Sequence, residues 1–187
     1  MDQQFGRLME ELDRLDLRRI TVIVFVSDHG YLLGEHQMWK KAKLWEEAIH
    51  VPLMIAAPGI EGGKTCHQVV ELVDLFPTLT DLAGLPKEPG AQGMSLLPLL
   101  RNPEKERSDK ADALIQIASG HCLRTKKWAY MWYPKKKKHQ EAFMLFDMEK
   151  DPQQFTNLAK NPEYAGPMRH LHERLVERIR ASKVDPD

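Results

Sequence analysis

An acidic residue and a histidine stand side by side directly after a hydrophobic run. Asp28 and His29 follow residues 20–26, which are aliphatic, aromatic or β-branched throughout, and Gly30 comes next. A carboxylate oxygen and a neutral imidazole nitrogen both bind divalent cations, and a glycine permits a sharp backbone turn beside them. The pair therefore predicts half of a metal site. The pair alone is also compatible with a polar turn, in which Asp28 caps the backbone and His29 bonds to a carbonyl.

The loop that follows the pair favours the metal-site interpretation. Residues 34–41 bring together an acid, a second imidazole, a tryptophan and two lysines, without an apolar period that would require burial. Convergent charged and aromatic groups after a strand are typical of a ligand site. We therefore predict that an anionic ligand is held beside the cation.

Several segments of the chain resemble the formylglycine-dependent sulfatases of the alkaline-phosphatase-like superfamily. The segments occur in the family's order, cover nearly the whole chain, and match the iduronate-2-sulfatase-like branch best. They are Asp28-His29-Gly30, Leu33-Gly34-Glu35-His36, Trp39, Lys41, His50-Val51-Pro52-Leu53, residues 73–79, residues 145–152 and Asn157-Leu158.

The resemblance implies a role for each of five residues. Asp28 and His29 would bind a divalent ion, usually calcium in this family, and a hard carboxylate oxygen suits that ion. Lys41 would contact the sulfate ester oxygens and stabilise the charge that builds on them, as a compact ammonium can. Tyr31 and His36 would lie near the pocket wall, with Tyr31 binding substrate and His36 joining Lys41 in catalysis.

The chain departs from the family pattern in one important respect. It contains no Cys/Ser-x-Pro-x-Arg motif for the formylglycine nucleophile, since neither Cys66 nor Cys122 is followed by Pro and Arg, and it contains no adjacent pair of aspartates. We therefore expect an inactive C-terminal portion of a sulfatase. Its partners would be the missing N-terminal half of the catalytic domain, which carries the formylglycine, and a sulfate-ester small molecule or sulfated glycan.

Two other functions remain open at this stage. The chain could be a non-catalytic module that binds an ion or an anion, or part of a phosphomonoester or phosphonate hydrolase of the same superfamily. Residues 35–41 favour a sulfatase. A Cys-x-Pro-x-Arg segment encoded in frame upstream of Met1 would support the enzyme.

Composition excludes some classes of function. Lys and Arg number 27 and Asp and Glu number 27, so the 187-residue chain lacks the basic excess of a nucleic-acid binder. The run Lys135–Lys138 is interpreted as a solvated hairpin tip rather than a polyanion contact. No apolar stretch approaches the ~20 residues of a membrane span. The residues after Met1 show no signal-peptide pattern, and two cysteines make no disulfide framework, so the compartment stays open.

The site must be positioned by an α/β scaffold. Apolar residues at spacings of three and four predict an amphipathic helix over residues 3–16. Residues 20–27 and 51–56 read as strands of a βαβ-type layer, the first of them a central parallel strand. A helix begins near Asp74, uses Leu75, Leu79 and Leu82 as its apolar face, and stops at Gly84. The expected fold is an alkaline-phosphatase-like mixed sheet flanked by helices, present in part.

A second domain is expected beyond residue 102. Residues 1–102 would be the C-terminal part of the sulfatase catalytic domain, and residues 103–187 a small α+β subdomain. Its short runs at residues 113–118, 122–125, 128–133 and 143–147 predict an antiparallel sheet. A closing helix follows, with a stripe of Met168, Leu171, Leu175 and Ile179. The aromatic residues of 128–133 are interpreted as packing rather than as a sugar platform.

Overall fold

The computed structural model describes residues 1–106, 111–137 and 140–182, and the chain divides into two compact units that alternate along the sequence. The first unit contains Met1–Ser27, Pro52–His67 and Leu72–Lys105, and the second contains Asp28–Val51, Gln68–Glu71 and the described part of Glu106–Asp187. The residues of the candidate metal pair, Asp28 and His29, open the first segment of the second unit. The predicted domain boundary near residue 102 stays a prediction, because packing units need not be independently folding domains.

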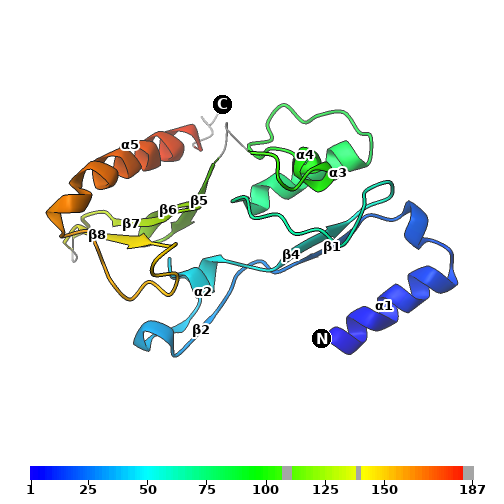
Figure 1. Cartoon of the computed structure of the whole chain (residues 1–187), viewed down its shortest axis with the longest axis horizontal. Coiled ribbons are helices and arrows are strands. Elements are labelled where there is room, and N and C mark those ends of the chain that lie inside the picture. Colours follow the sequence, from blue (N-terminus) through cyan, green and yellow to red (C-terminus); the bar gives the residue numbers. More distant parts are fainter. Residues whose placement is uncertain (107–110, 138–139, 183–187) are drawn as a thin grey trace. The chain divides into compact units, whose positions relative to one another are not determined.

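The first unit contains helices and a two-stranded sheet (Figure 1). Its elements are α1 (Asp2–Arg14), η1 (Arg18–Ile20), β1 (Ile23–Val26), β4 (Leu53–Ala56), η3 (Leu72–Asp74), α3 (Leu75–Leu82) and α4 (Leu97–Arg101). The predicted helix over residues 3–16 is confirmed as α1, and the Phe5 ring meets the Phe25 ring of β1 edge-on at 5.3 Å between centroids. Helix α4 had no counterpart in the sequence-based expectation.

The parallel arrangement predicted for the first strand is wrong. β1 and β4 run antiparallel, with Val24 opposite Ile55, and Val26 and Met54 are 39% and 58% exposed. The strand itself was correctly located, because a run of β-branched residues marks a strand. Such a run does not fix the direction of the partner strand. The segment between the two strands contains one α-helix, the four-residue α2 (Glu46–Ile49), rather than a long crossover helix.

Helix α3 ends as predicted but buries different residues. Gly84 has φ of 66°, its N–H donates to the Asp81 carbonyl, and the N–H of the next residue donates to the Thr80 carbonyl, which is a Schellman C-cap. Leu79, expected on the apolar face, is 42% exposed, whereas Thr78 is fully buried. The Thr78 hydroxyl accepts the Leu96 N–H at 2.7 Å, so a polar contact fixes the loop before α4 to the helix.

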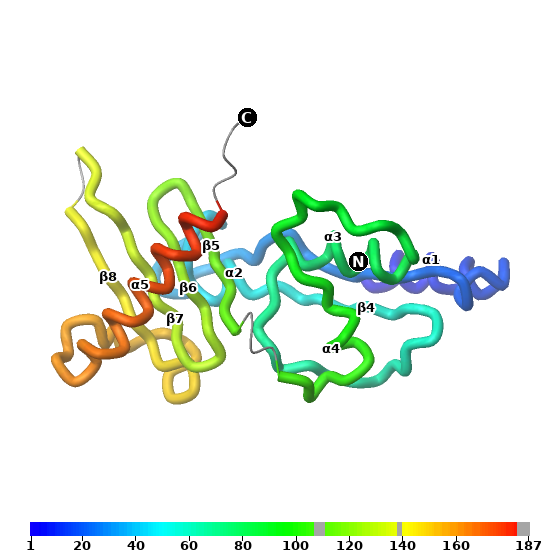
Figure 2. Tube along the Cα trace, turned by 90° about the horizontal axis from the view of Figure 1, so that it is seen from above, coloured from blue at the N-terminus to red at the C-terminus, as the bar shows by residue number. Residues whose placement is uncertain are grey.

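The second unit is built on a four-stranded antiparallel meander, as expected. Its order is β5-β6-β7-β8, and helix α5 (Ala165–Ala181), preceded by the short turn η4 (Pro162–Tyr164), lies across one face (Figures 1 and 2). The strands are β5 (Asp112–Ile117), β6 (Gly120–Thr125), β7 (Trp128–Tyr133) and β8 (Ala142–Asp147). Leu171 and Leu175 of the predicted stripe pack on Tyr130, with Trp128 and Trp132 against the same cluster. The closing helix and the packing role of these aromatic residues are confirmed.

The opposite face of the meander is covered by the segment that carries the candidate site. Successive strand residues point to opposite faces, so Cys122, Ala129 and Phe146 face away from α5. They form a core with Leu32, Leu44 and Trp45. This segment contains β2 (Leu32–Leu33), η2 (Glu35–Gln37), β3 (Trp39–Lys40) and α2 (Glu46–Ile49). The α/β class, with its small antiparallel sheet and closing helix, is confirmed.

A half-buried ion pair holds α2 to the sheet. Both guanidinium contacts of Arg124 go to the Glu46 carboxylate, at 2.9 and 3.1 Å, and both side chains are 19% exposed. The Glu46 N–H at the start of α2 donates to the side-chain oxygen of Gln154 at 2.8 Å. A bidentate pair of this kind fixes geometry as well as adding energy. The candidate loop is thus anchored to strand β6.

Three sequence-based expectations concern features outside the site. Both cysteines are free thiols, Cys66 exposed and Cys122 buried, and burial raises the pKa of Cys122 to about 12. The lysine run extends to Lys138, which lies outside the described residues, so its interpretation stays a prediction. Within the described ranges, no helix is long and apolar enough to cross a membrane.

Candidate metal and anion site

Asp28 and His29 converge at their polar ends. Asp28 Oδ2 lies 3.5 Å from His29 Nε2, and Asp28 Oδ1 accepts the His29 backbone N–H at 3.0 Å. The Asp28 side chain is 84% exposed and that of His29 is 36% exposed. The two groups therefore share a solvent-accessible position that a ligand can reach.

The contacts of His29 define which ring nitrogen donates and which accepts. Nδ1 lies 2.9 Å from the Gly30 carbonyl oxygen, which can only accept, and Nε2 lies 2.9 Å from the Lys41 ammonium, which can only donate. One arrangement satisfies both contacts: Nδ1 carries the proton and Nε2 presents its lone pair. Histidines that bind metals are oriented in this way, with the second ring nitrogen donating to a carbonyl or carboxylate.

Gly30 fixes the site residues against α2. Its N–H donates to the Ala48 carbonyl at 3.0 Å, and a Cβ at this position would lie 1.9 Å from the Glu47 carbonyl oxygen. No side chain fits in that space. The glycine next to the pair thus permits close backbone approach, which the sequence had indicated only as a sharp turn.

The loop between the pair and Lys41 has an unusual backbone. Gly34 has φ of 132°, and residues with side chains also occupy positive φ, namely His36 (53°), Gln37 (57°), Lys40 (86°) and Ala42 (60°). Such conformations cost of order 1–3 kcal/mol each and persist where surrounding contacts impose them, often at functional sites. The sequence offered little signal for this feature, because Gln37, Lys40 and Ala42 belong to residue types that rarely adopt positive φ.

Glu35 closes this loop locally. Its carboxylate accepts the Leu33 N–H at 2.6 Å, and the backbone hydrogen bonds that it accepts, that of Leu33 first, lower the pKa of Glu35 below its usual value. The Gly34 N–H donates to the Met38 carbonyl at 3.0 Å. A fixed carboxylate at this point keeps β2 and β3 together, with Leu32 opposite Lys40.

The structure brings Asp28, His29 and Lys41 together and places the other two predicted residues differently. Tyr31 is 48% exposed on the same segment. His36 is packed: its side chain is 8% exposed and its ring stacks on Trp45 at 3.9 Å between centroids with an interplanar angle of 11°. His36 Nε2 lies 3.6 Å from Glu47 Oε2, a buried oxygen that has no hydrogen-bond partner.

Asp28 and His29 offer two donor atoms, a carboxylate oxygen and an imidazole nitrogen. Calcium takes six to eight oxygen ligands in flexible geometry, so Asp28 suits that ion and His29 would add a nitrogen donor. Among the residues that the structure describes, no group of three or more His, Cys, Asp or Glu side chains is arranged to hold a metal. The chain therefore fits an ion as a contributor of ligands rather than as its complete cage.

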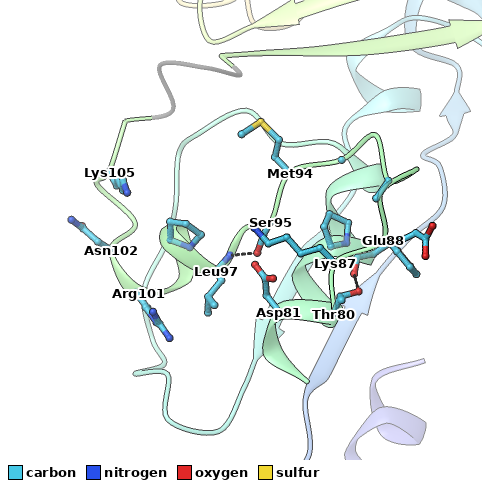
Figure 3. A pocket seen from close by; sticks show the side chains of 15 residues that line it. Thr80, Asp81, Lys87, Glu88, Met94, Ser95, Leu97, Arg101, Asn102 and Lys105 are labelled. Atoms are coloured by element: carbon cyan, nitrogen blue, oxygen red, sulfur yellow. Dashed lines mark hydrogen bonds between the residues drawn. The ribbon is translucent and has the colours of Figure 1, made fainter. Parts of the chain in front are cut away.

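A separate cavity in the first unit was not anticipated from the sequence. It has a volume of about 800 Å³ and lies between α3, α4 and the loop that joins them. Figure 3 shows Arg101, Asn102 and Lys105 on one side of it and Lys87 with Glu88 on the other. Its lining also includes apolar residues, among them Phe76, Pro77 and Leu97. The cavity could not be predicted from the sequence, because part of its lining comes from α4, a helix that was not predicted.

The chain matches a known sulfatase family. Residues 34–181 fit the family model described as N-sulphoglucosamine sulphohydrolase, C-terminal. This match covers well over half of the chain, and the chain therefore belongs to this family of sulfatase C-terminal regions. The expected sulfatase family is confirmed, whereas the iduronate-2-sulfatase-like branch stays a prediction.

Curated relatives are also sulfatases. The chain is 36% identical to human arylsulfatase K over 174 residues, which is 87% of this chain and 32% of that protein. It is 37% identical to choline-sulfatase of Rhizobium meliloti (strain 1021) over 190 residues, which is 99% of this chain and 36% of that protein. The chain thus spans about a third of the length of the relatives it matches.

Solved structures share the fold and differ in chemistry. One protein, solved in complex with its substrate D-glucosamine-2-N,6-O-disulfate, superposes with a TM-score of 0.87 at 29% identity, over 96% of this chain and 38% of that one. The phosphonate monoester hydrolase of Agrobacterium radiobacter superposes with a TM-score of 0.82 at 27% identity, over 96% of this chain and 39% of that one. A protein described with a sulfated substrate and a phosphonate monoester hydrolase therefore share this fold.

Proposed function

We propose that this chain supplies one half of a sulfatase active site, comprising part of the coordination of a calcium ion and a lysine for the sulfate ester. One observation carries the proposal. In a member of a sulfatase family, Asp28 Oδ2 and Lys41 Nζ lie 3.5 and 2.9 Å from the same nitrogen, His29 Nε2.

Each of the three residues has a chemical role in this proposal. Asp28 provides an anionic oxygen and His29 a lone pair on Nε2, which the Gly30 carbonyl keeps available by holding the proton on Nδ1. A bound calcium ion would supply Lewis-acid stabilisation of negative charge. Lys41 places an ammonium where charge builds on the sulfate oxygens. The formylglycine nucleophile is expected on a part of the enzyme that this chain does not contain.

The remaining predicted residues receive separate roles. The catalytic role predicted for His36 stays a prediction, and its stacking on Trp45 supports a role in holding the loop that carries Lys41. The exposed ring of Tyr31 suits contact with the alcohol portion of a substrate. With the nucleophile outside this chain, we propose that residues 1–187 alone hydrolyse no sulfate ester.

The substrate class is a sulfate ester, either a sulfated sugar or a small alcohol sulfate. A structural neighbour is described with a sulfated glucosamine and a relative is a choline-sulfatase, which supports both forms. An iduronate-2-sulfatase-like preference is the finer version of this proposal. A phosphonate or phosphomonoester hydrolase is the second candidate, supported by the hydrolase from Agrobacterium radiobacter. A non-catalytic ion- or anion-binding module is the third.

A chimera tests the proposal. Residues 1–187 replace the matching segment of the Rhizobium meliloti choline-sulfatase, and turnover of an aryl sulfate, an aryl phosphate and an aryl phosphonate is compared. We expect the sulfate ester to be hydrolysed fastest. Changing Lys41→Ala should lower kcat/KM by about 10²-fold or more, the usual size of losing one charge-stabilising group.

The matched control for this experiment is the neighbouring lysine. Lys40→Ala removes the same charge one residue away and should change kcat/KM by less than about threefold, within the range of surface changes. Equal kinetics for Lys41→Ala and the parent chimera would remove Lys41 from the site. Faster turnover of the phosphonate ester would favour the second candidate function.

A further inference from the structure

The Lys41 ammonium contacts His29 Nε2, the nitrogen that would bind the cation in the proposed function. The ammonium lies 2.9 Å from His29 Nε2, and the Asp28 carboxylate lies 3.5 Å from the same nitrogen. A positive charge thus already lies against His29, one of the two residues proposed as ion ligands. The ammonium contacts the ring nitrogen that a divalent cation would use.

The two cations exclude each other at this atom. With Nδ1 protonated towards Gly30, the imidazole has a single lone pair, on Nε2, and it cannot accept from an ammonium and bind an ion at once. Two unit charges 4 Å apart also repel by about 1 kcal/mol even in bulk water, and a divalent ion repels more. Cation binding to His29 therefore requires Lys41 to move away.

We infer that Lys41 and a divalent cation are alternative occupants of His29 Nε2, so that cation binding releases Lys41 to contact the sulfate ester. This inference rests on the proposed function, because it assumes that Asp28 and His29 bind the ion and that Lys41 binds the anion. Its consequence is ordered assembly. The anion-binding lysine becomes available only when the ion is in place.

Lys41 can move away from His29 through its side chain while the loop backbone stays in place. Lys40 and Ala42, on either side of Lys41, both have positive φ, at 86° and 60°. Lys40 is also paired with Leu32 in the short β2–β3 sheet. The pairing with Leu32 thus holds the backbone directly before Lys41, whereas the four-carbon stem of a lysine is flexible. The exchange needs only a rotation of that stem.

Calcium titration of the calcium-free chimera, which contains the remainder of the catalytic domain, tests the exchange without any activity measurement. Nuclear magnetic resonance of labelled protein follows the ring nitrogens of His29 and the side-chain nitrogen of Lys41 as CaCl₂ is added. We expect both signals to change together, with one apparent dissociation constant. Lys41→Met should tighten calcium binding about tenfold, since a charge-assisted hydrogen bond of about 1.5 kcal/mol no longer competes. Lys40→Met, the matched control, should leave the affinity unchanged.

The possible results separate the exchange from the ion site itself. If His29 responds to calcium while Lys41 does not, or if Lys41→Met binds calcium no more tightly than the parent, the exchange is wrong and the ion site stands. If neither residue responds at concentrations well above the roughly 1 mM dissociation constants of weak calcium sites, the ion site and the exchange both fail. Amide spectra of each variant confirm that the fold is retained.

Discussion

The proposed site depends most on one residue, His29, because both of its ring nitrogens have defined partners. The Gly30 carbonyl holds Nδ1 and the Lys41 ammonium meets Nε2. A role for Asp28 and His29 as metal ligands was predicted from the sequence, because a carboxylate and an imidazole stand side by side after a hydrophobic strand. The sequence could not predict the Lys41 contact, because a lysine 12 positions along the chain reaches the imidazole only through the folded loop.

Gly30 gives the sharpest residue-scale prediction. Gly30→Ala should destabilise the chain by about 1–3 kcal/mol or more, because its Cβ would overlap the Glu47 carbonyl oxygen and force the backbone of α2 to move. Urea unfolding measures the change as a lower midpoint. Gly62→Ala is the control, since nothing lies within 4 Å of a Cβ there. A Gly30→Ala midpoint equal to that of the control would contradict the close approach.

The site depends at the element scale on the loop of residues 34–42 and on α2. Trp45, the residue before α2, stacks on His36 in the loop and packs in a core that includes Phe146 of β8. Glu46 then binds Arg124 of β6. The position of Lys41 is thus set by elements of the meander that lie far along the sequence.

The stability of this loop should depend on His36. His36→Ala should weaken the loop by about 0.5–1.5 kcal/mol, the contribution of an aromatic pair beyond its buried area. Amide exchange over residues 32–40 should become faster, and His36→Phe should restore slow exchange because it keeps the stack on Trp45. A variant His36→Phe that exchanges slowly but lowers kcat in the chimera would instead assign His36 to the chemistry.

The sequence predicted some elements well and others poorly for physical reasons. Strands β5 to β8 and helix α5 followed from alternation and from the stripe at Leu171 and Leu175, since local patterns decide which face is buried. The antiparallel pairing of β1 with β4 did not follow, because pairing direction is a tertiary property. The five residues of α4 were missed since so short a helix has no period to detect.

The whole chain corresponds to about a third of the length of the sulfatases that it matches. The order of segments within the family was recognisable from the sequence. The division into two units was not, because Asp28–Val51 joins the later meander by packing of Leu32, Leu44 and Trp45. A local pattern cannot show which distant sheet such a segment will cover.

The calcium content of the chimera measures whether Asp28 and His29 bind an ion. Atomic emission analysis after dialysis should find about one calcium per chain, the number of ions that the proposed site holds. Asp28→Ala and His29→Ala should each lower this content well below one and abolish most sulfate-ester turnover, because each removes a ligand. A full complement of calcium in both folded variants would contradict the account.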